Sequence, residues 1–248
     1  MTDTQTEAKK LTADEFSRQV LEDKPRVAIF DCDGTLWSGD SGYGFMVWSL
    51  EQGLVSRSTS DWIDARYRSY CAGDIDEETI CGEMVQMYAG LHERELQSAA
   101  AEYVRSFVLP RVFSEMATLV EDLTKAGTEL WAVSSTNRWV VTEGVRAFGI
   151  PEERVLAADV IVVAGNITST LKDVPTDEGK ATALKRVGLS RPDMVFGNSL
   201  HDLAMLDLAA KAFPVNPSPG LLEAAASRGW GYFRPAAAEV VRPAASEE

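Results

Sequence analysis

Residues 27–37, Val-Ala-Ile-Phe-Asp-Cys-Asp-Gly-Thr-Leu-Trp, run from an apolar segment directly into a polar turn. Residues 27–30 are all apolar, as expected for a buried strand of a parallel sheet. Asp31 and Asp33 follow at its carboxyl end, where open α/β sheets bind their ligands. Alternate side chains of an extended chain point the same way, so both carboxylates can share one site. Gly34 permits the sharp turn that follows, and the paired carboxylates favour a hard divalent cation such as Mg²⁺.

The composition is that of an ordinary globular chain, with 248 residues, 45% hydrophobic, 25% charged and a net charge of −14. There is no block of Lys and Arg, which argues against nucleic-acid binding. No apolar run is long enough to predict a membrane span, and the polar start does not resemble a signal peptide. The three cysteines, Cys32, Cys71 and Cys81, favour a reduced, cytoplasmic location, although a Cys71–Cys81 disulfide stays open.

Strands and helices alternate along most of the chain, which predicts an α/β protein with a doubly wound, Rossmann-like parallel sheet. Thr12-Ala13-Asp14-Glu15 has the form of a capping box within a helix at 10–22. Further strands are expected at 27–31, 128–134, 194–197 and 212–215, with two short strands around a Gly165-Asn166 turn in 154–171. Further helices are expected at 111–126, 137–148, 178–187, 201–209 and 218–228.

Residues 41–108 show helical periodicity and no convincing strand. Four helices are expected there, at about 42–52, 59–72, 76–90 and 93–107, with glycines after the first three. We therefore expect an α/β core made of residues 1–40 and 109–235, a helical cap at 41–108, and a mobile tail at 236–248.

The segment Asp31-Cys32-Asp33-Gly34-Thr35-Leu36 resembles the first motif, D-x-D-G-T-L, of haloacid dehalogenase (HAD) superfamily phosphatases. Three more motifs of that superfamily follow in order: Ser134 at the end of a strand, Lys180 at a helix start, and residues 197–202 after a further strand. The helical insert between the first two motifs resembles the phosphoserine-phosphatase branch.

The resemblance implies a Mg²⁺-dependent phosphomonoesterase. Asp31 would be the nucleophile that forms an aspartyl-phosphate, and Asp33 the general acid and base. Ser134 and Lys180 would complete the catalytic set. The phosphate-binding residues would be Ser134, Ser135, Lys180 and Gly34. From local sequence alone, Ser135 competes with Ser134, and Lys172 and Lys185 compete with Lys180.

The expected metal ligands are Asp31, Asp33 through its backbone carbonyl, Asn198 and Asp202. The family's usual fourth motif is G-D-S/G-x-x-D, whereas this chain has Gly-Asn-Ser-Leu-His-Asp at 197–202. Asn198 can still offer a carbonyl oxygen to Mg²⁺, but one negative charge is lost. We expect weaker Mg²⁺ binding or a larger role for Asp202, directly or through water.

Two acidic residues are predicted to contact the substrate from the cap side. Asp40 lies nine residues after Asp31, where the resembled branch contacts the substrate's amino group, and Glu83 lies on the third cap helix. The position of that branch's cap arginine is Met84 here, so phosphoserine itself is disfavoured unless an arginine of the preceding helix substitutes. The aromatic residues Trp37, Tyr43, Trp48 and Tyr88 suit a cationic group or simply pack the cap.

The predicted substrate is a small polar phosphate ester, with an amine-bearing ester as one candidate. Two alternatives stay open: a phosphotransferase that uses the same intermediate, and a non-catalytic protein of the same fold that binds a phosphate ligand. The chain is expected to be a monomer or a homodimer, with no nucleic-acid or membrane partner.

Overall fold

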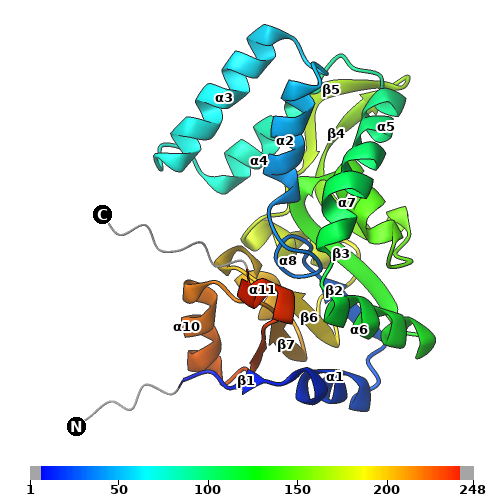
Figure 1. Cartoon of the computed structure of the whole chain (residues 1–248), viewed down its shortest axis with the longest axis vertical. Coiled ribbons are helices and arrows are strands. Elements are labelled where there is room, and N and C mark those ends of the chain that lie inside the picture. The colour runs from blue at the N-terminus through cyan, green and yellow to red at the C-terminus, as the bar shows by residue number, and fades with distance from the viewer. Residues whose placement is uncertain (1–6, 241–248) are drawn as a thin grey trace.

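The computed structural model describes residues 7–240 and contains one six-stranded sheet, in the order β5-β4-β3-β2-β6-β7 (Figure 1). Neighbouring strands are parallel except β4 and β5, which form an antiparallel hairpin. The strands are β2 (Val27–Phe30), β3 (Glu129–Asn137), β4 (Val155–Val163), β5 (Asn166–Asp173), β6 (Met194–Gly197) and β7 (Lys211–Pro214). The predicted α/β class is confirmed, and β2 lies in the middle of the sheet.

Helices cover both faces of the sheet, as a doubly wound fold requires. Ala28 and Phe30 of β2 pack on the side of α1 (Ala13–Glu22), α6 (Ser114–Lys125) and α7 (Arg138–Arg146). Ile29 packs on the opposite side, with α8 (Glu178–Arg186), α9 (Leu203–Leu206) and α10 (Pro219–Arg228). This alternation along an apolar strand explains why β2 is buried on both faces.

The segment 41–108 consists of helices and connecting turns and contains no strand, as predicted. Its helices are α2 (Ser41–Glu51), α3 (Arg57–Cys71), α4 (Glu77–Gln86) and α5 (Glu93–Tyr103), followed by the π-helical turn η1 (Val104–Val108). Helix α4 ends four residues before the predicted end at residue 90, and the last predicted helix changes to π-helical hydrogen bonding at Val104. In Figure 1, α2, α3 and α4 lie together at one end of the molecule, and α4 contacts β3, β4 and β5.

Several short elements were not predicted. A two-residue parallel pair joins β1 (Lys10–Leu11) to β8 (Tyr232–Phe233). Three 3-10 turns, η2 (Leu109–Arg111), η3 (Glu152–Arg154) and η4 (Leu200–Asp202), connect larger elements. Residues 236–240 of the predicted tail form α11 (Ala236–Val240), and residues 241–248 lie outside the described part of the chain.

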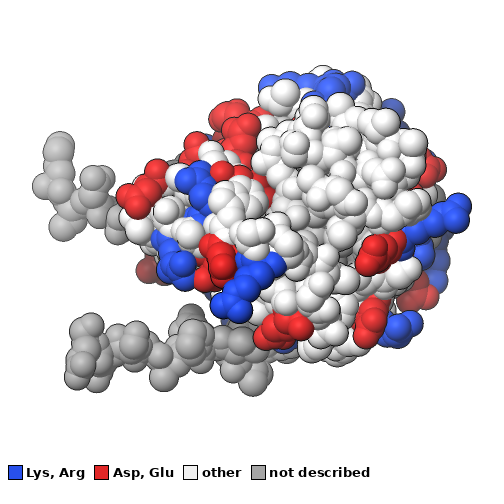
Figure 2. All heavy atoms as spheres, turned by 90° about the horizontal axis from the view of Figure 1, so that it is seen from above, with Lys and Arg blue, Asp and Glu red and all other residues white. Residues whose placement is uncertain are grey.

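Within residues 7–240, no helix is both long and apolar enough to cross a lipid bilayer. On the face shown in Figure 2, Lys and Arg are scattered among acidic residues near the margins and form no continuous basic patch. This face therefore lacks the positive surface typical of nucleic-acid binding.

Candidate active site

Asp31 lies just past the end of β2 and is 5% exposed. Its N–H donates to the carbonyl of Phe196 in β6 at 2.9 Å, which extends the sheet by one residue. The chain then turns through Gly34, whose φ of 78° is in the left-handed region that glycine adopts without strain. The Thr35 hydroxyl donates to Asp31 Oδ2 at 3.0 Å. The strand end and the turn together fix the orientation of the Asp31 carboxylate.

Lys180 bridges two buried carboxylates. It lies in the first turn of α8, is 2% exposed, and donates from Nζ to Asp31 Oδ1 at 2.7 Å and to Asp202 Oδ1 at 2.6 Å. This contact identifies Lys180 as the lysine of the site. The competing Lys172 instead forms an ion pair with Asp159.

Asp202 is fully buried and faces Lys180 instead of the cavity. Its second oxygen, Oδ2, accepts from the N–H groups of Asn198 at 2.8 Å and Ser199 at 3.0 Å. A Cβ at Gly197 would lie 2.6 Å from Asp202 Cβ, so glycine at that position makes room for the carboxylate. Both oxygens of Asp202 accept from protein donors and its side chain does not line the cavity, so the structure places Asp202 behind Lys180.

The buried cluster of Asp31, Lys180 and Asp202 contains two carboxylates and one ammonium group, so negative charge is in excess. Burial, and then the neighbouring Asp202 carboxylate, raise the pKa of Asp31 to about 7, although Lys180 acts in the opposite direction. Burial alone would lower the pKa of Lys180, but Asp202 and Asp31 outweigh it and hold that pKa above the ordinary value. Lys180 is therefore a permanent cation, and a further cation would favour the ionised form of Asp31.

Asp33 is held by three hydrogen bonds from three segments. Oδ1 accepts from the indole Nε1 of Trp37 at 2.6 Å and from the N–H of Ser41 at 2.8 Å. Oδ2 accepts from the hydroxyl of Thr136 at 2.8 Å. Asp33 lines the same cavity as Asp31, which confirms that the i, i+2 spacing brings the two carboxylates to one site.

Ser134 lies where the regular pairing of β3 with β4 is interrupted, since the register shifts between Ser134 and Asn137. Ser134 and Ser135 line the cavity, and Ser134 Oγ accepts from the N–H of Thr136 at 3.2 Å. The Asn137 side chain instead caps α7. The hydroxyl and backbone donors available to an anion thus come mainly from Ser134 and Ser135.

Asn198 packs directly over the turn at Gly34. A Cβ at Gly34 would lie 2.0 Å from Asn198 Nδ2, so only glycine permits this approach. Within residues 7–240, no group of three His, Cys, Asp or Glu side chains is placed to hold a metal ion. A cation here would therefore need the Asp31 carboxylate with amide or backbone oxygens. Such all-oxygen donors suit Mg²⁺, and the excess negative charge around Asp31 fits the same ion.

The cavity has a volume of about 310 Å³ and extends from these residues toward α3 and α4. We call the part of the cavity beside α2, α3 and α4 its outer part, and Asp40, Tyr67, Tyr70 and Glu77 line it. Asp40 keeps contact with solvent, but partial desolvation, followed by the Asp33 charge, raises its pKa to about 6. Tyr70 donates its hydroxyl to Glu77 Oε2 at 2.5 Å. Asp40 is thus confirmed as a cavity residue.

Glu83 does not line the cavity, which contradicts its predicted place beside the substrate. Its oxygens instead accept from Arg66 Nε at 2.8 and 2.9 Å. The expected aromatic residues do not line the cavity either: Trp37 and Tyr88 are buried in the core, and Tyr43 stacks on Tyr67.

His201 also lines the cavity. Its Nδ1 lies 2.8 Å from Asp177 Oδ1, and its Nε2 lies 3.4 Å from Glu77 Oε2. It therefore joins the fourth-motif loop to the first residue of α4. No local sequence signal indicates this contact, because Glu77 and His201 meet only through tertiary packing.

Comparison with known proteins identifies the family of the chain. The sequence model of the haloacid dehalogenase-like hydrolases matches residues 28–207. A histidinol-phosphatase of Neisseria meningitidis is 26% identical over 215 residues, covering 82% of this chain and 96% of that protein. A probable phosphatase of Mycobacterium tuberculosis is 28% identical over 213 residues, covering 82% of this chain and 73% of that protein.

A solved structure of a Bordetella pertussis protein of unknown function matches with a TM-score of 0.74 and 25% identity, covering 84% of this chain and 98% of that one. The fold and the site define a hydrolase with an aspartate at the end of a central parallel strand. The chain belongs to the haloacid dehalogenase-like hydrolase family, and it is a phosphatase.

Proposed function

We propose that the chain is a Mg²⁺-dependent phosphomonoesterase that works through an aspartyl-phosphate on Asp31. The observation that carries this proposal is the double hydrogen bond from Lys180 to Asp31 and Asp202 beside the cavity. It holds a buried carboxylate next to a permanent cation, as a nucleophile for an anionic phosphate ester needs. Asp31, Ser134 and Lys180 all face the same cavity.

In this proposal Asp31 attacks phosphorus while Lys180, Ser134 and Ser135 bind the phosphoryl oxygens. Asp33 gives a proton to the leaving oxygen and later takes one from the attacking water. Asp31, the Asp33 backbone carbonyl and Asn198 would hold Mg²⁺, whose charge offsets the repulsion between carboxylate and phosphate. Asp202 acts only through Lys180.

We propose a small, amine-bearing phosphate ester as the substrate. Among the described residues lining the cavity, Lys180 is the only Lys or Arg, and it already pairs with two carboxylates. A substrate carboxylate would find no free cation there, which disfavours phosphoserine. Asp40 and Glu77 instead offer negative charge at the outer end. The histidinol-phosphatase relative supports this choice, because histidinol is an amino alcohol.

We further propose that residues 41–108 act as a cap over an α/β core made of residues 1–40 and 109–235. The contact between Glu77 and His201 supports this, since it joins the helical segment to the core at the cavity. Closure of the cap would exclude bulk water during phosphoryl transfer. The three free cysteines favour the cytoplasm as its location.

The first test is phosphate release from a panel of small phosphomonoesters, with Mg²⁺ and with EDTA. We expect metal-dependent turnover, highest with phosphorylated amino alcohols. Adding acceptor alcohols and analysing the products separates hydrolysis from phosphotransfer. If metal-free protein turns over the substrates as fast in EDTA as in Mg²⁺, the metal requirement is contradicted.

Replacing Asp40 by Asn should weaken the use of amine-bearing esters selectively. Asparagine is as good a helix N-cap as aspartate, so α2 should keep the cap that Asp40 provides to Tyr43. Loss of the charge should raise KM for an amine-bearing ester by about tenfold or more, and change KM for an uncharged alkyl phosphate little. Asp76→Asn, at the N-cap of α4 and outside the cavity, is the matched control.

The same assignment predicts a pH effect. Asp40 must be ionised to attract an ammonium group, and its pKa is about 6. The ratio of kcat/KM for the amine-bearing ester to kcat/KM for the alkyl phosphate should therefore fall as pH drops through that value. Taking the ratio cancels the ionisation of Asp31. A ratio that is independent of pH, or equally pH-dependent in Asp40→Asn, would contradict the role of Asp40.

Replacing Asn198 by Asp should tighten Mg²⁺ binding by about tenfold, because a carboxylate adds a negative charge to the oxygen ligands. Isothermal titration with Mg²⁺ measures this without relying on activity. Asn166→Asp adds the same charge at the β4–β5 hairpin and serves as the control. Equal Mg²⁺ affinities of the wild-type protein and Asn198→Asp would exclude Asn198 as a ligand.

A further inference from the structure

The indole of Trp37 forms one of the shortest contacts of the site, 2.6 Å from its Nε1 to Asp33 Oδ1. We propose that Trp37 is a positioning residue, which with Thr136 and Ser41 orients the Asp33 carboxylate for proton transfer to the leaving oxygen. This inference rests on the proposed function, in which Asp33 is the acid and base.

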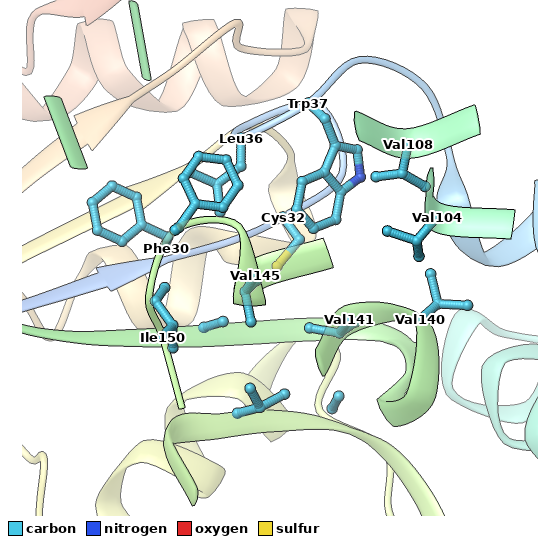
Figure 3. Close-up of a cluster of buried hydrophobic side chains, with 14 of the residues drawn as sticks. Phe30, Cys32, Leu36, Trp37, Val104, Val108, Val140, Val141, Val145 and Ile150 are labelled. Atoms are coloured by element: carbon cyan, nitrogen blue, oxygen red, sulfur yellow. The ribbon is translucent and has the colours of Figure 1, made fainter. Parts of the chain in front are cut away.

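Packing prevents the indole from turning away. Trp37 is 1% exposed, and Figure 3 shows its ring in the buried cluster with Val104 and Val108 of η1 and with Val140 and Val141 of α7. A Cβ at Gly144 would lie 2.9 Å from Cη2 of the ring, so the glycine makes space for it. The direction of the indole N–H is therefore determined by the core.

The backbone of the turn restrains the same residue. The Trp37 carbonyl accepts from the N–H of Gly34 at 2.7 Å, and Trp37 forms isolated bridges with Asp33 and Val112. A buried indole N–H without an acceptor is unfavourable, so Trp37 stabilises the conformation in which the Asp33 carboxylate accepts from it. The carboxylate position is thus linked to the core through one side chain.

The backbone N–H of Ser41 and the hydroxyl of Thr136 fix the orientation of the Asp33 carboxylate plane. Ser41 donates from the first residue of α2 to the oxygen that Trp37 binds, and Thr136 donates from β3 to the other oxygen. A Cβ at Gly42 would lie 2.6 Å from Thr136 Oγ1, so the start of α2 fits closely around this hydroxyl. Donors at both oxygens restrict rotation about the carboxyl group, and a change in the position of α2 would move Asp33.

Proton donation matters most when the leaving group is poor, which gives a specific test. An alkyl phosphate needs a proton on its leaving oxygen, whereas 4-nitrophenyl phosphate largely does not. For Trp37→Phe we expect kcat/KM to fall by about tenfold or more with the alkyl phosphate, and by less than about threefold with 4-nitrophenyl phosphate. A general packing defect would lower both values equally.

The chain offers a matched control. Trp131 on β3 donates its indole N–H to Glu129 Oε1, also at 2.6 Å, near the strand's amino end. Trp131→Phe removes an equivalent indole–carboxylate bond away from the cavity. It should leave the ratio of the two kcat/KM values unchanged.

A second pair of variants keeps the test valid if Trp37→Phe does not fold. Thr136→Val removes the donor to Asp33 Oδ2 and preserves the shape of the side chain, whereas Thr136→Ser keeps the hydroxyl. We expect Thr136→Val to show the same leaving-group selectivity and Thr136→Ser to restore most of the activity with the alkyl phosphate.

Asp33→Asn distinguishes failure of this inference from failure of the proposed function. If Asp33→Asn lowers kcat/KM, which does not include the later hydrolysis of the aspartyl-phosphate, equally for both substrates, Asp33 is not the acid, and that part of the proposed function is wrong. If Asp33→Asn is selective for the alkyl phosphate but Trp37→Phe and Thr136→Val are not, only the positioning role is overturned.

Discussion

Replacing Asp31 by Asn is expected to lower turnover by about 10³-fold or more while the protein stays folded. The amide cannot form the acyl phosphate, yet its oxygen can still accept from Lys180 while its NH2 group donates to the Thr35 hydroxyl, in place of the two present contacts of Asp31. Steady-state kinetics of purified protein measure the loss. Asp193→Asn is the control, because Asp193 accepts from the N–H groups of Arg26 and Val27 at the opposite end of β2.

The same substitution should stabilise the fold above neutral pH. The pKa of Asp31 is raised from 3.8 to about 7 in the folded protein, so its ionised form is disfavoured there. As pH rises, Asp31 ionises at a lower pH in the unfolded chain than in the folded protein. The free energy of unfolding of the wild-type protein therefore falls between about pH 4 and 7. At about pH 8, Asp31→Asn should therefore be more stable by about 1–2 kcal/mol, since Lys180 keeps Asp202 as partner.

Urea unfolding at acidic and alkaline pH measures this difference. We expect the stability advantage of Asp31→Asn to grow as pH rises through about 7. Wild-type turnover in the variant would refute Asp31 as nucleophile, and a variant less stable than wild type at alkaline pH would refute the charge argument.

Replacing Asp202 by Ala should have the largest effect on stability, about 3–5 kcal/mol. The carboxylate is fully buried and accepts from Lys180 and from two backbone N–H groups; the N–H groups would lose this partner, and Lys180 would keep only Asp31. Turnover should also fall strongly, because Lys180 would no longer be held between two carboxylates.

Chemical denaturation compares this variant with Asp207→Ala. Asp207 forms a two-bond ion pair with Arg228 at the surface, at 2.7 and 2.9 Å. An exposed pair contributes at most about 1 kcal/mol. Equal losses in the two variants would contradict the structural role assigned to Asp202 and Lys180.

The sequence predicts those parts of the fold that depend on local order. The apolar run before Asp31 and the Gly165-Asn166 turn identify β2 and the β4–β5 hairpin. The capping box is confirmed, since Thr12 and Glu15 bond each other's backbone N–H groups. The pair β1–β8 was not predictable, because two residues of each strand carry no periodic pattern.

The inner part of the site is predictable because four motifs lie at strand ends or helix starts, which the sheet brings together. The outer part is not. Glu77 and Glu83 are six residues apart on α4, so they point to different faces of the helix, and the packing of α3 and α4 decides which one lines the cavity. The contacts of Asp202 with Lys180 and two backbone N–H groups could not be predicted, because they depend on tertiary structure and loop geometry.

The central claim is that phosphate is transferred to Asp31, and the most direct test is to trap that intermediate. Borohydride added during turnover of an alkyl phosphate with Mg²⁺ reduces an acyl phosphate to the alcohol, and mass spectrometry locates the change. The proposal predicts homoserine at position 31, and no such change without substrate. Active turnover with unmodified Asp31, or with the modification at another carboxylate, would contradict it.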